Sequence, residues 1–239
     1  MTAQTGNTVP MRIIAHIRTD FPEKFGVPRQ SGIVETLRGK IVFEPEFRNA
    51  DALRGIDGFS HLWLLWQFSE NPQKPWSPTV RPPKLGGNRR MGVFATRSPF
   101  RPNPLGLSCV RLEKVELHTP NGPILVVTGA DMTDNTPIFD IKPYVPYADA
   151  RPKARGGFAV PPAEVHLQVD FPQALLKKLP EEKRETLMDV LAQDPRPGYR
   201  QEDGERVYGF PFAGFEVRFT VYGKTLTVCA VEKMANSGL

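Results

Sequence analysis

Hydrophobic and polar residues alternate over short stretches in the first 150 positions of the chain, which is the pattern of β-strands with one buried face. In residues 11–18, for example, Ile13, Ala15 and Ile17 alternate with basic side chains. Similar stretches predict strands at residues 40–43, 107–117, 124–130 and 138–142. The stretches on either side of residues 119–123 are expected to form a hairpin, because prolines and a glycine lie between them.

Few helical periods occur before residue 150, and glycine and proline separate the predicted strands. Residues 61–68 are nearly all apolar or aromatic, so we expect a strand that is buried on both faces. Many short strands with such connections predict a mainly β fold in which the strands close, or partly close, into a barrel. We expect this barrel domain to cover residues 9–150.

The pattern changes after residues 149–162, which are rich in proline, glycine, arginine and lysine and are expected to form a linker. A strand, a helical segment and two strands are then predicted at residues 165–171, 172–193, 215–221 and 226–230. Pro180 breaks the helical segment, and the two glutamates after it favour a helix start there. The sequence therefore predicts a small α+β domain over residues 163–239, which we expect to bind tRNA or to support a dimer.

Residues 92–106 contain two arginines, an asparagine and three prolines between apolar residues. Proline lacks a backbone N–H group and has a fixed φ angle, so these residues cannot form a helix or a central strand. We expect a stiff, irregular loop that holds Arg97, Arg101 and Asn103 in fixed positions. Guanidinium groups held in this way suit an anionic or planar ligand, although composition alone would also fit a solvated surface turn.

Positive charge is concentrated around this loop. Residues 71–112 contain no aspartate or glutamate but eight lysines and arginines, although the net charge of the whole chain is only +5. The positive residues are Lys74, Arg81, Lys84, Arg89, Arg90, Arg97, Arg101 and Arg111. A local positive field of this kind favours phosphates, carboxylates or nucleic acid as ligands.

Several other kinds of site have no support in the sequence. The four histidines and two cysteines lack the spacing of metal ligands, so we expect no metal site. There is also no glycine-rich motif of the Rossmann or P-loop type. Residues 1–10 are polar and no apolar run is long enough to span a membrane, so we expect a cytoplasmic protein whose Cys109 and Cys229 are reduced and buried.

The run from Gly92 to Asn103 resembles the signature of the TsaA-like family, whose members are S-adenosylmethionine-dependent tRNA methyltransferases of the TrmO type. Six further blocks resemble the family in the same order, at residues 28–30, 59–63, 79–83, 85–88, 140–144 and 194–199. The resemblance implies a single-sheet β-barrel with S-adenosylmethionine as the methyl donor. It also implies methylation at N6 of threonylcarbamoyladenosine, the modified base beside the anticodon of some tRNAs.

The resemblance further implies a set of donor-binding residues. They are Pro28, Arg29, Gln30, Ser69, Glu70, Arg97, Leu107, Asp131, Met132, Thr133 and Asp134. Without the resemblance, Arg29 and Gln30 would be interpreted as part of a solvated loop, and residues 131–134 as a turn that caps the backbone. Asn135 stands where glycine is common in the family. Because asparagine tolerates a left-handed φ angle, we expect this turn to be kept.

The acceptor N6 atom must lose a proton as the methyl group arrives, and a carboxylate near the barrel mouth could accept it. We expect Asp134 or Asp140 to take this role, and Asn103 of the stiff loop is the third candidate catalytic residue. His61 lies in an apolar, aromatic context, so we expect it to be structural.

We expect the basic residues to contact the anticodon arm of tRNA. The predicted tRNA-binding residues are Arg81, Lys84, Arg89, Arg90, Arg101, Arg196, Tyr199 and Arg200. The last three would equally fit a rigid helix end with a packed tyrosine. A homodimer is also expected, because a barrel with proline-rich loops offers a shallow mouth that a second copy could complete, and because the resemblance implies one. Two alternatives stay open: a non-catalytic RNA-binding barrel and a small-molecule methyltransferase on the same barrel.

Overall fold

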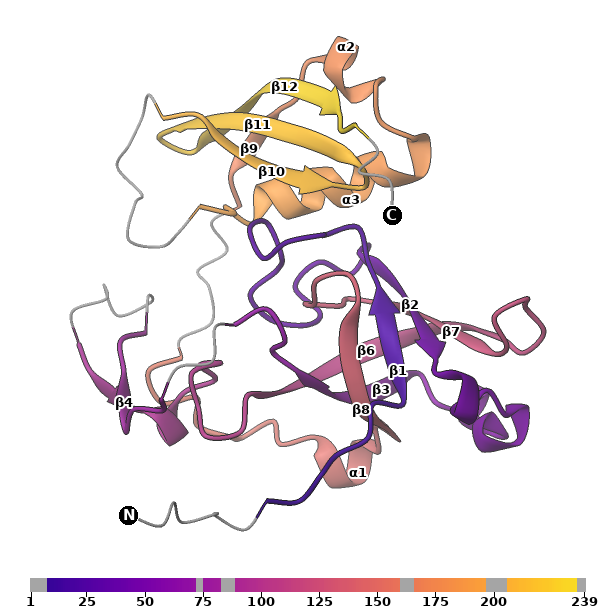
Figure 1. Ribbon diagram of the computed structural model, residues 1–239. Coiled ribbons are helices and arrows are strands. Elements are labelled where there is room, and N and C mark those ends of the chain that lie inside the picture. Colours follow the sequence, from indigo (N-terminus) through magenta and orange to yellow (C-terminus); the bar gives the residue numbers. More distant parts are fainter. Residues whose placement is uncertain (1–7, 72–74, 83–88, 160–165, 197–205, 236–239) are drawn as a thin grey trace.

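The computed structural model describes residues 8–71, 75–82, 89–159, 166–196 and 206–235, and its N-terminal part is a closed β-barrel (Figure 1). The strands follow one another in the order β1-β2-β7-β6-β3-β8, and each neighbouring pair is antiparallel. Their bounds are β1 (Ala15–Arg18), β2 (Arg38–Phe43), β3 (His61–Gln67), β6 (Leu105–Glu116), β7 (Ile124–Thr128) and β8 (Thr136–Pro143). The predicted barrel is therefore confirmed.

Alternation along the strands fills the barrel interior with apolar side chains. In β3, Leu62, Leu64 and Trp66 are buried, whereas the residues between them are only half-buried. The prediction that this strand is buried on both faces is therefore wrong. The outward-facing Trp63 donates a hydrogen bond from Nε1 to Asp149 Oδ2 (3.1 Å) in helix α1 (Pro146–Asp149), and this four-residue helix is too short to cover the strand.

The hairpin predicted around residues 119–123 is confirmed, because β6 and β7 pair in antiparallel register. After β7 the chain runs through irregular residues 129–135 and returns to the barrel at β8. Asn135 has a φ angle of 61°, and its backbone N–H donates to the Ile17 carbonyl oxygen at 2.8 Å. The expected left-handed turn is thus kept, and it places residues 131–134 at the end of β7.

Between β3 and β6 the chain leaves the barrel and forms a small excursion. The strands β4 (Thr79–Val80) and β5 (Met91–Gly92) make a two-stranded ribbon, and the 3-10 helix Val93–Ala95 follows it. Residues 96–104 are irregular, as their prolines predict. Thr96 organises this loop: its hydroxyl accepts the Ser98 N–H at 3.2 Å, and its carbonyl oxygen accepts Arg101 Nη1 at 3.1 Å.

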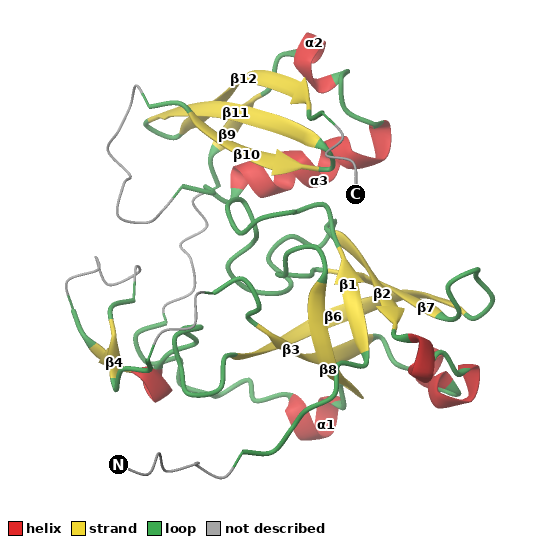
Figure 2. Cartoon of the chain, viewed as in Figure 1, coloured by secondary structure: helices red, strands yellow, loops and turns green. Residues whose placement is uncertain are grey.

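The C-terminal part is a four-stranded sheet in the order β10-β11-β12-β9, packed against helix α3 (Figure 2). Its elements are β9 (Gln168–Asp170), α2 (Gln173–Leu176), α3 (Glu181–Ala192), β10 (Tyr208–Phe212), β11 (Phe215–Tyr222) and β12 (Thr225–Lys233). Helix α3 begins directly after Pro180, as predicted, and Leu187, Val190 and Leu191 are buried on its inner side.

Two features of this sheet differ from the sequence-based expectation. Strand β10 was not predicted, because Gly209 and Pro211 interrupt its apolar pattern. Cys229 is exposed on β12, and Cys109 of the barrel is only half-buried, so the prediction that both cysteines are buried is wrong. The neighbour of Cys229, Val228, faces the core instead. A strand sends successive side chains to opposite faces, and only one face of this strand meets the core.

Residues 19–37, which we call the junction loop, join the hydrophobic core of the C-terminal sheet, whereas the barrel interior forms a separate core. Phe21, Val34 and Leu37 of this loop belong to the same buried cluster as Phe210 of β10. At Gly26, whose φ angle is 93°, an added Cβ atom would lie 2.7 Å from the Phe210 ring. The junction loop is therefore packed against the C-terminal part as closely as a core element.

Polar contacts also hold both ends of the junction loop to the C-terminal part. At one end, the Asp20 carboxylate accepts Lys183 Nζ at 2.7 Å, and the Asp20 carbonyl oxygen accepts the Ala213 N–H at 2.8 Å. At the other end, the Thr36 hydroxyl donates to Asp189 Oδ2 at 2.6 Å. The loop between these anchors carries Pro28, Arg29 and Gln30, so the C-terminal part supports one wall of the barrel mouth.

Candidate functional site

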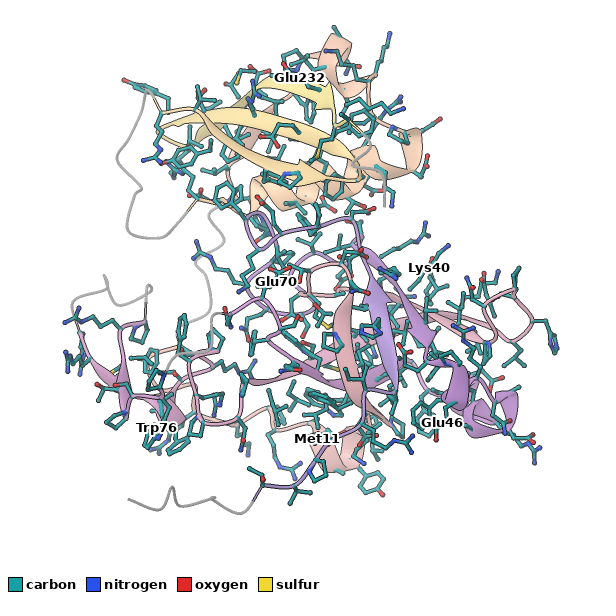
Figure 3. The ribbon with its side chains drawn as sticks, viewed as in Figure 1. Met11, Lys40, Glu46, Glu70, Trp76 and Glu232 are labelled. Carbon is teal, nitrogen blue, oxygen red and sulfur yellow. The ribbon has the colours of Figure 1, made fainter. Side chains whose placement is uncertain are left out.

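A cavity of about 790 Å³ lies at the mouth of the barrel. Three of its walls come from the end of β3 with the residues after it, from the irregular loop at residues 96–104 (the stiff loop), and from the start of β6. The segment after β7 and the middle of the junction loop complete the lining. Glu70, labelled in Figure 3, lines it on the side that faces the C-terminal part. The volume falls within the range of cavities that hold a small-molecule cofactor.

The floor of the cavity is an aromatic surface. The Trp66 ring lies over Gly106, where an added Cβ atom would come within 2.2 Å of the indole, so only glycine fits beneath it. Phe68 meets Trp66 edge-on, with 4.4 Å between the ring centroids. Leu65 and Met132 complete the apolar lining. Such a surface suits the flat face of a purine.

A buried hydrogen-bonded chain runs from this floor to an acidic group. Trp66 Nε1 donates to Ser108 Oγ at 2.9 Å, and Ser108 Oγ donates to Asp131 Oδ1 at 2.6 Å. Burial raises the pKa of Asp131, whereas the Ser108 hydroxyl, backbone N–H groups and the charge of Arg97 act in the opposite direction. The chain fixes the position of this carboxyl group, and its raised pKa makes it a better proton acceptor than an ordinary aspartate.

Cationic and amide side chains surround the opening. Arg97 donates from Nη1 to Gln30 Oε1, which joins the stiff loop to the junction loop. Arg29 donates from Nη2 to the carbonyl oxygen of Arg196 at 2.9 Å, so the C-terminal part orients this arginine. Lys24 donates to Asn71 Oδ1 on the same rim, and burial lowers its pKa. The site therefore combines an apolar floor, one fixed carboxyl group and a positive rim.

The structure brings together most of the predicted donor-binding residues. The cavity is lined by Pro28, Arg29, Gln30, Ser69, Glu70, Arg97, Leu107, Asp131, Met132 and Thr133, and also by Asn103 and Arg101. Sequence analysis missed Trp66, Phe68, Gly106 and Ser108, because aromatic and small residues in a strand are normally interpreted as core. A glycine inside a strand does signal a close approach, and Gly106 could have been identified on that ground.

Both predicted catalytic carboxylates lie outside the cavity lining. Asp134 Oδ1 accepts the Thr19 N–H at 3.0 Å, and its other oxygen faces Arg18 at 3.4 Å, so it caps the backbone outside the cavity. Asp140 lies on β8 with its carboxylate 3.0 Å from Lys142 Nζ, and it does not line the cavity either. The catalytic roles of Asp134 and Asp140 stay predictions, and the positions of both residues outside the cavity lining argue against these roles. Among the described residues, Glu70 and Asp131 are the acidic groups in the cavity wall.

The predicted tRNA-binding residues separate into four groups, one of which is Arg101 alone, half-buried in the lining of the barrel-mouth cavity. Arg81, Arg89 and Arg90 are exposed on the excursion that carries β4 and β5. Lys84, Tyr199 and Arg200 lie outside the described residues. Arg196 is buried and its guanidinium pairs with Asp194, with Nε 2.8 Å from Oδ1 and Nη2 2.9 Å from Oδ2, so we remove it from the predicted tRNA surface.

The described part of the chain contains no group of three or more histidine, cysteine, aspartate or glutamate residues that could hold a metal ion. No helix among the described residues is long and apolar enough to cross a membrane.

Known proteins with similar sequences and structures identify the family of this chain. Residues 16–150 match the tRNA-methyltransferase O N-terminal domain, and residues 164–234 match the TrmO C-terminal domain. The chain is 43% identical over 226 residues to the tRNA (adenine(37)-N6)-methyltransferase of Escherichia coli strain K12, covering 92% of this chain and 96% of that protein. It is 49% identical over 165 residues to the enzyme of the same name from Eikenella corrodens, covering 68% of this chain and 91% of the relative.

A solved structure gives the same result for the fold. The crystal structure of TrmO from Pseudomonas aeruginosa superimposes with a TM-score of 0.76 at 33% identity, covering 94% of this chain and 99% of that chain. Family models and structure together thus account for both the barrel and the C-terminal sheet. The chain belongs to the tRNA-methyltransferase O (TrmO) family.

Proposed function

We propose that this protein uses S-adenosylmethionine to methylate N6 of adenosine 37 in tRNA. The observation that carries the proposal is the barrel-mouth cavity, in which an aromatic floor, a buried carboxyl group and an arginine rim converge in a member of the TrmO family. The names of the relatives support both substrates. A relative from Pseudomonas aeruginosa is named as a putative S-adenosylmethionine-dependent methyltransferase, and the Escherichia coli relative is named for adenine 37 of tRNA.

The residues of the cavity fit the donor by their chemistry. The Trp66 and Phe68 rings suit its adenine, the Glu70 carboxylate suits its hydroxyl or ammonium groups, and the Arg97 guanidinium suits its carboxylate. When bound, S-adenosylmethionine supplies a methyl group that is already activated on a sulfonium sulfur. The protein therefore has to align the acceptor with this group and exclude water, and alignment alone can supply about 7–11 kcal/mol of the barrier reduction.

Proton removal is the one chemical step that the chain itself must provide. As the N6–carbon bond forms, the N6–H bond breaks and its proton needs an acceptor. We assign this role to Asp131, because Ser108 orients its carboxylate and burial raises its pKa. The carboxylate must be deprotonated to act, so activity is expected to be lost as the pH falls through the raised pKa of Asp131.

The finer parts of the proposal concern the acceptor and the assembly. We infer that N6 of the accepted adenine carries a threonylcarbamoyl group, whose carboxylate is complemented by arginines of the excursion such as Arg90 and Arg101. Arg81, Arg89 and Arg90 are placed to contact phosphates of the anticodon arm. A homodimer would deepen the shallow mouth and extend this basic surface, and a tRNA substrate places the enzyme in the cytoplasm.

Donor binding tests the proposal and separates it from a non-catalytic RNA-binding barrel. Titration calorimetry with S-adenosylmethionine should show binding to the wild-type protein and none to Arg97→Ala, while circular dichroism shows an unchanged fold. Arg54→Ala is the matched control, since Arg54 is an exposed arginine paired with Asp51 on a separate 3-10 helix. Unchanged affinity in Arg97→Ala would remove Arg97 from the site, and no binding to the wild type would leave only an RNA-binding role.

A further inference from the structure

A second hollow, of about 1400 Å³, adjoins the barrel-mouth cavity. It lies between the excursion that carries β4 and β5, the stiff loop, and residues 156–159. Gln30, Phe94, Arg97 and Pro99 line both hollows, so the hydrogen bond between Arg97 and Gln30 lies on their boundary. A ligand in this hollow, which we call the excursion groove, would be the immediate neighbour of a ligand in the barrel-mouth cavity.

The lining of the excursion groove is aromatic and positively charged. Phe94 is 74% exposed and Phe100 is 47% exposed, and Phe158 faces the groove from the opposite segment. Several large aromatic side chains gathered in one exposed hollow, unlike a single exposed ring, usually mark a binding surface. Arg81, Arg90 and Arg97 are the charged members of the lining, and no acidic residue is found among the described residues that form it.

These features narrow the chemistry of the ligand. Exposed aromatic rings stack on nucleobases, and arginines pair with phosphates or carboxylates. A protein segment buried here would have to offer acidic groups to three arginines, whereas a nucleotide of the anticodon loop supplies both an aromatic base and phosphates. Enzymes that act on a base extrude it from its stack into a pocket that reads it by stacking.

We propose that the excursion groove holds the acceptor nucleotide, extruded from the anticodon loop, with its base stacked on Phe100 and Phe94 and its anionic groups paired with Arg81 and Arg90. The proposal rests on the proposed function and specifies where the second substrate lies. The shared wall explains how the two substrates meet, because a base against Phe94 borders the cavity that holds the methyl donor. Arg97 and Gln30 then contact both substrates at the point of transfer.

Phe100 offers the cleanest test, because it lines the excursion groove and not the barrel-mouth cavity. Loss of one stacking partner is expected to weaken binding of the acceptor by about 5- to 150-fold. For Phe100→Ala we therefore expect the Kd of an anticodon stem-loop, measured by fluorescence anisotropy, and the KM for tRNA to rise by such a factor. The calorimetric Kd for S-adenosylmethionine should stay at the wild-type value.

Tyr222→Ala is the matched control, since Tyr222 is an 82% exposed aromatic residue of β11 in the C-terminal sheet. Its stem-loop and donor affinities should equal those of the wild type, and thermal melts of both variants check that they are folded. Wild-type stem-loop affinity in Phe100→Ala would overturn the proposal. So would a change from dimer to monomer with unchanged stem-loop affinity, because a second copy of the chain would then occupy the groove.

The stem-loop measurement also separates this inference from the proposed function. A wild-type protein that binds the stem-loop through Phe100 but transfers no methyl group would contradict the enzyme activity and retain the groove. Methylation that is independent of Phe100 would retain the activity and contradict the groove.

Discussion

Replacement of Asp194 by alanine removes the carboxylate that holds the Arg196 guanidinium at the junction between the barrel and the C-terminal sheet. The Arg196 side chain is 5% exposed and that of Asp194 is 20% exposed, so the pair lies largely out of water. Loss of one member of a buried ion pair costs about 3–5 kcal/mol. For a chain of this size, that corresponds to a fall in Tm of about 6–20 °C.

The same substitution should weaken donor binding at a distance. Arg29 of the barrel-mouth cavity donates to the Arg196 carbonyl oxygen at 2.9 Å, so displacement of Arg196 releases Arg29. A hydrogen bond from a charged group contributes about 1.5–3 kcal/mol, so its loss would raise the Kd for S-adenosylmethionine by up to about 150-fold. Asp194→Asn should have a smaller effect, since asparagine keeps an acceptor oxygen and tolerates the left-handed φ angle of 52°.

Thermal melts and donor calorimetry on the same preparations measure both effects. Asp57→Ala, which removes an exposed aspartate of the 3-10 helix Ile56–Gly58, should change the free energy of unfolding by no more than about 0.5 kcal/mol. An Asp194→Ala protein with wild-type Tm would contradict the energetic argument. A destabilised variant with wild-type donor affinity would show that the C-terminal part does not position Arg29.

Three further predictions follow from the site. Gly106→Ala should displace the Trp66 ring, lower Tm and weaken donor binding; wild-type values in melts and calorimetry would show that the floor tolerates a side chain. Asp131→Asn should abolish turnover with little change in the KM for tRNA. Because burial raises the pKa of Asp131, the wild-type rate should fall on acidification at a pH above the range in which ordinary carboxyl groups titrate. A wild-type rate that falls only within the ordinary carboxyl range would exclude Asp131 as the proton acceptor. The double variant Arg89→Ala, Arg90→Ala should flatten the slope of log K for tRNA against log salt by about one to two units, and an unchanged slope would exclude phosphate contacts at these residues.

The strand pattern predicts the barrel because alternation reports directly which side chains face the core. The prediction for residues 61–68 was wrong about the outer face of the strand, because aromatic residues on that face, such as Trp63, are hydrophobic without being fully buried. Strand β10 was not predicted because Gly209 and Pro211 are poor strand formers and stand between its apolar residues. The packing of Phe21 of the junction loop into the core of the C-terminal sheet joins segments far apart in the sequence, and no local pattern predicts such contacts.

The candidate site was predictable to the extent that its residues lie in short motifs. Arg97, Gln30 and Asp131 lie in three different motifs, and the fold brings all three residues into the lining of one cavity. The roles of Asp134 and Arg196 depend on their partners. Asp134 accepts a hydrogen bond from Thr19, which is far away in the sequence, whereas Arg196 pairs with Asp194, only two residues away. Motifs therefore identified the neighbourhood, whereas only the fold separates the residues that face the cavity from those that support it.

Methyl transfer to tRNA tests the central claim most directly. The protein is incubated with S-adenosylmethionine labelled in its methyl group and with tRNA that lacks this one modification, and the nucleosides are then separated and identified by mass spectrometry. The account predicts label on N6 of adenosine 37, in its threonylcarbamoylated form, and no transfer by Arg97→Ala. Label that appears only in small metabolites, at another nucleotide, or at the same rate with Arg97→Ala would contradict it.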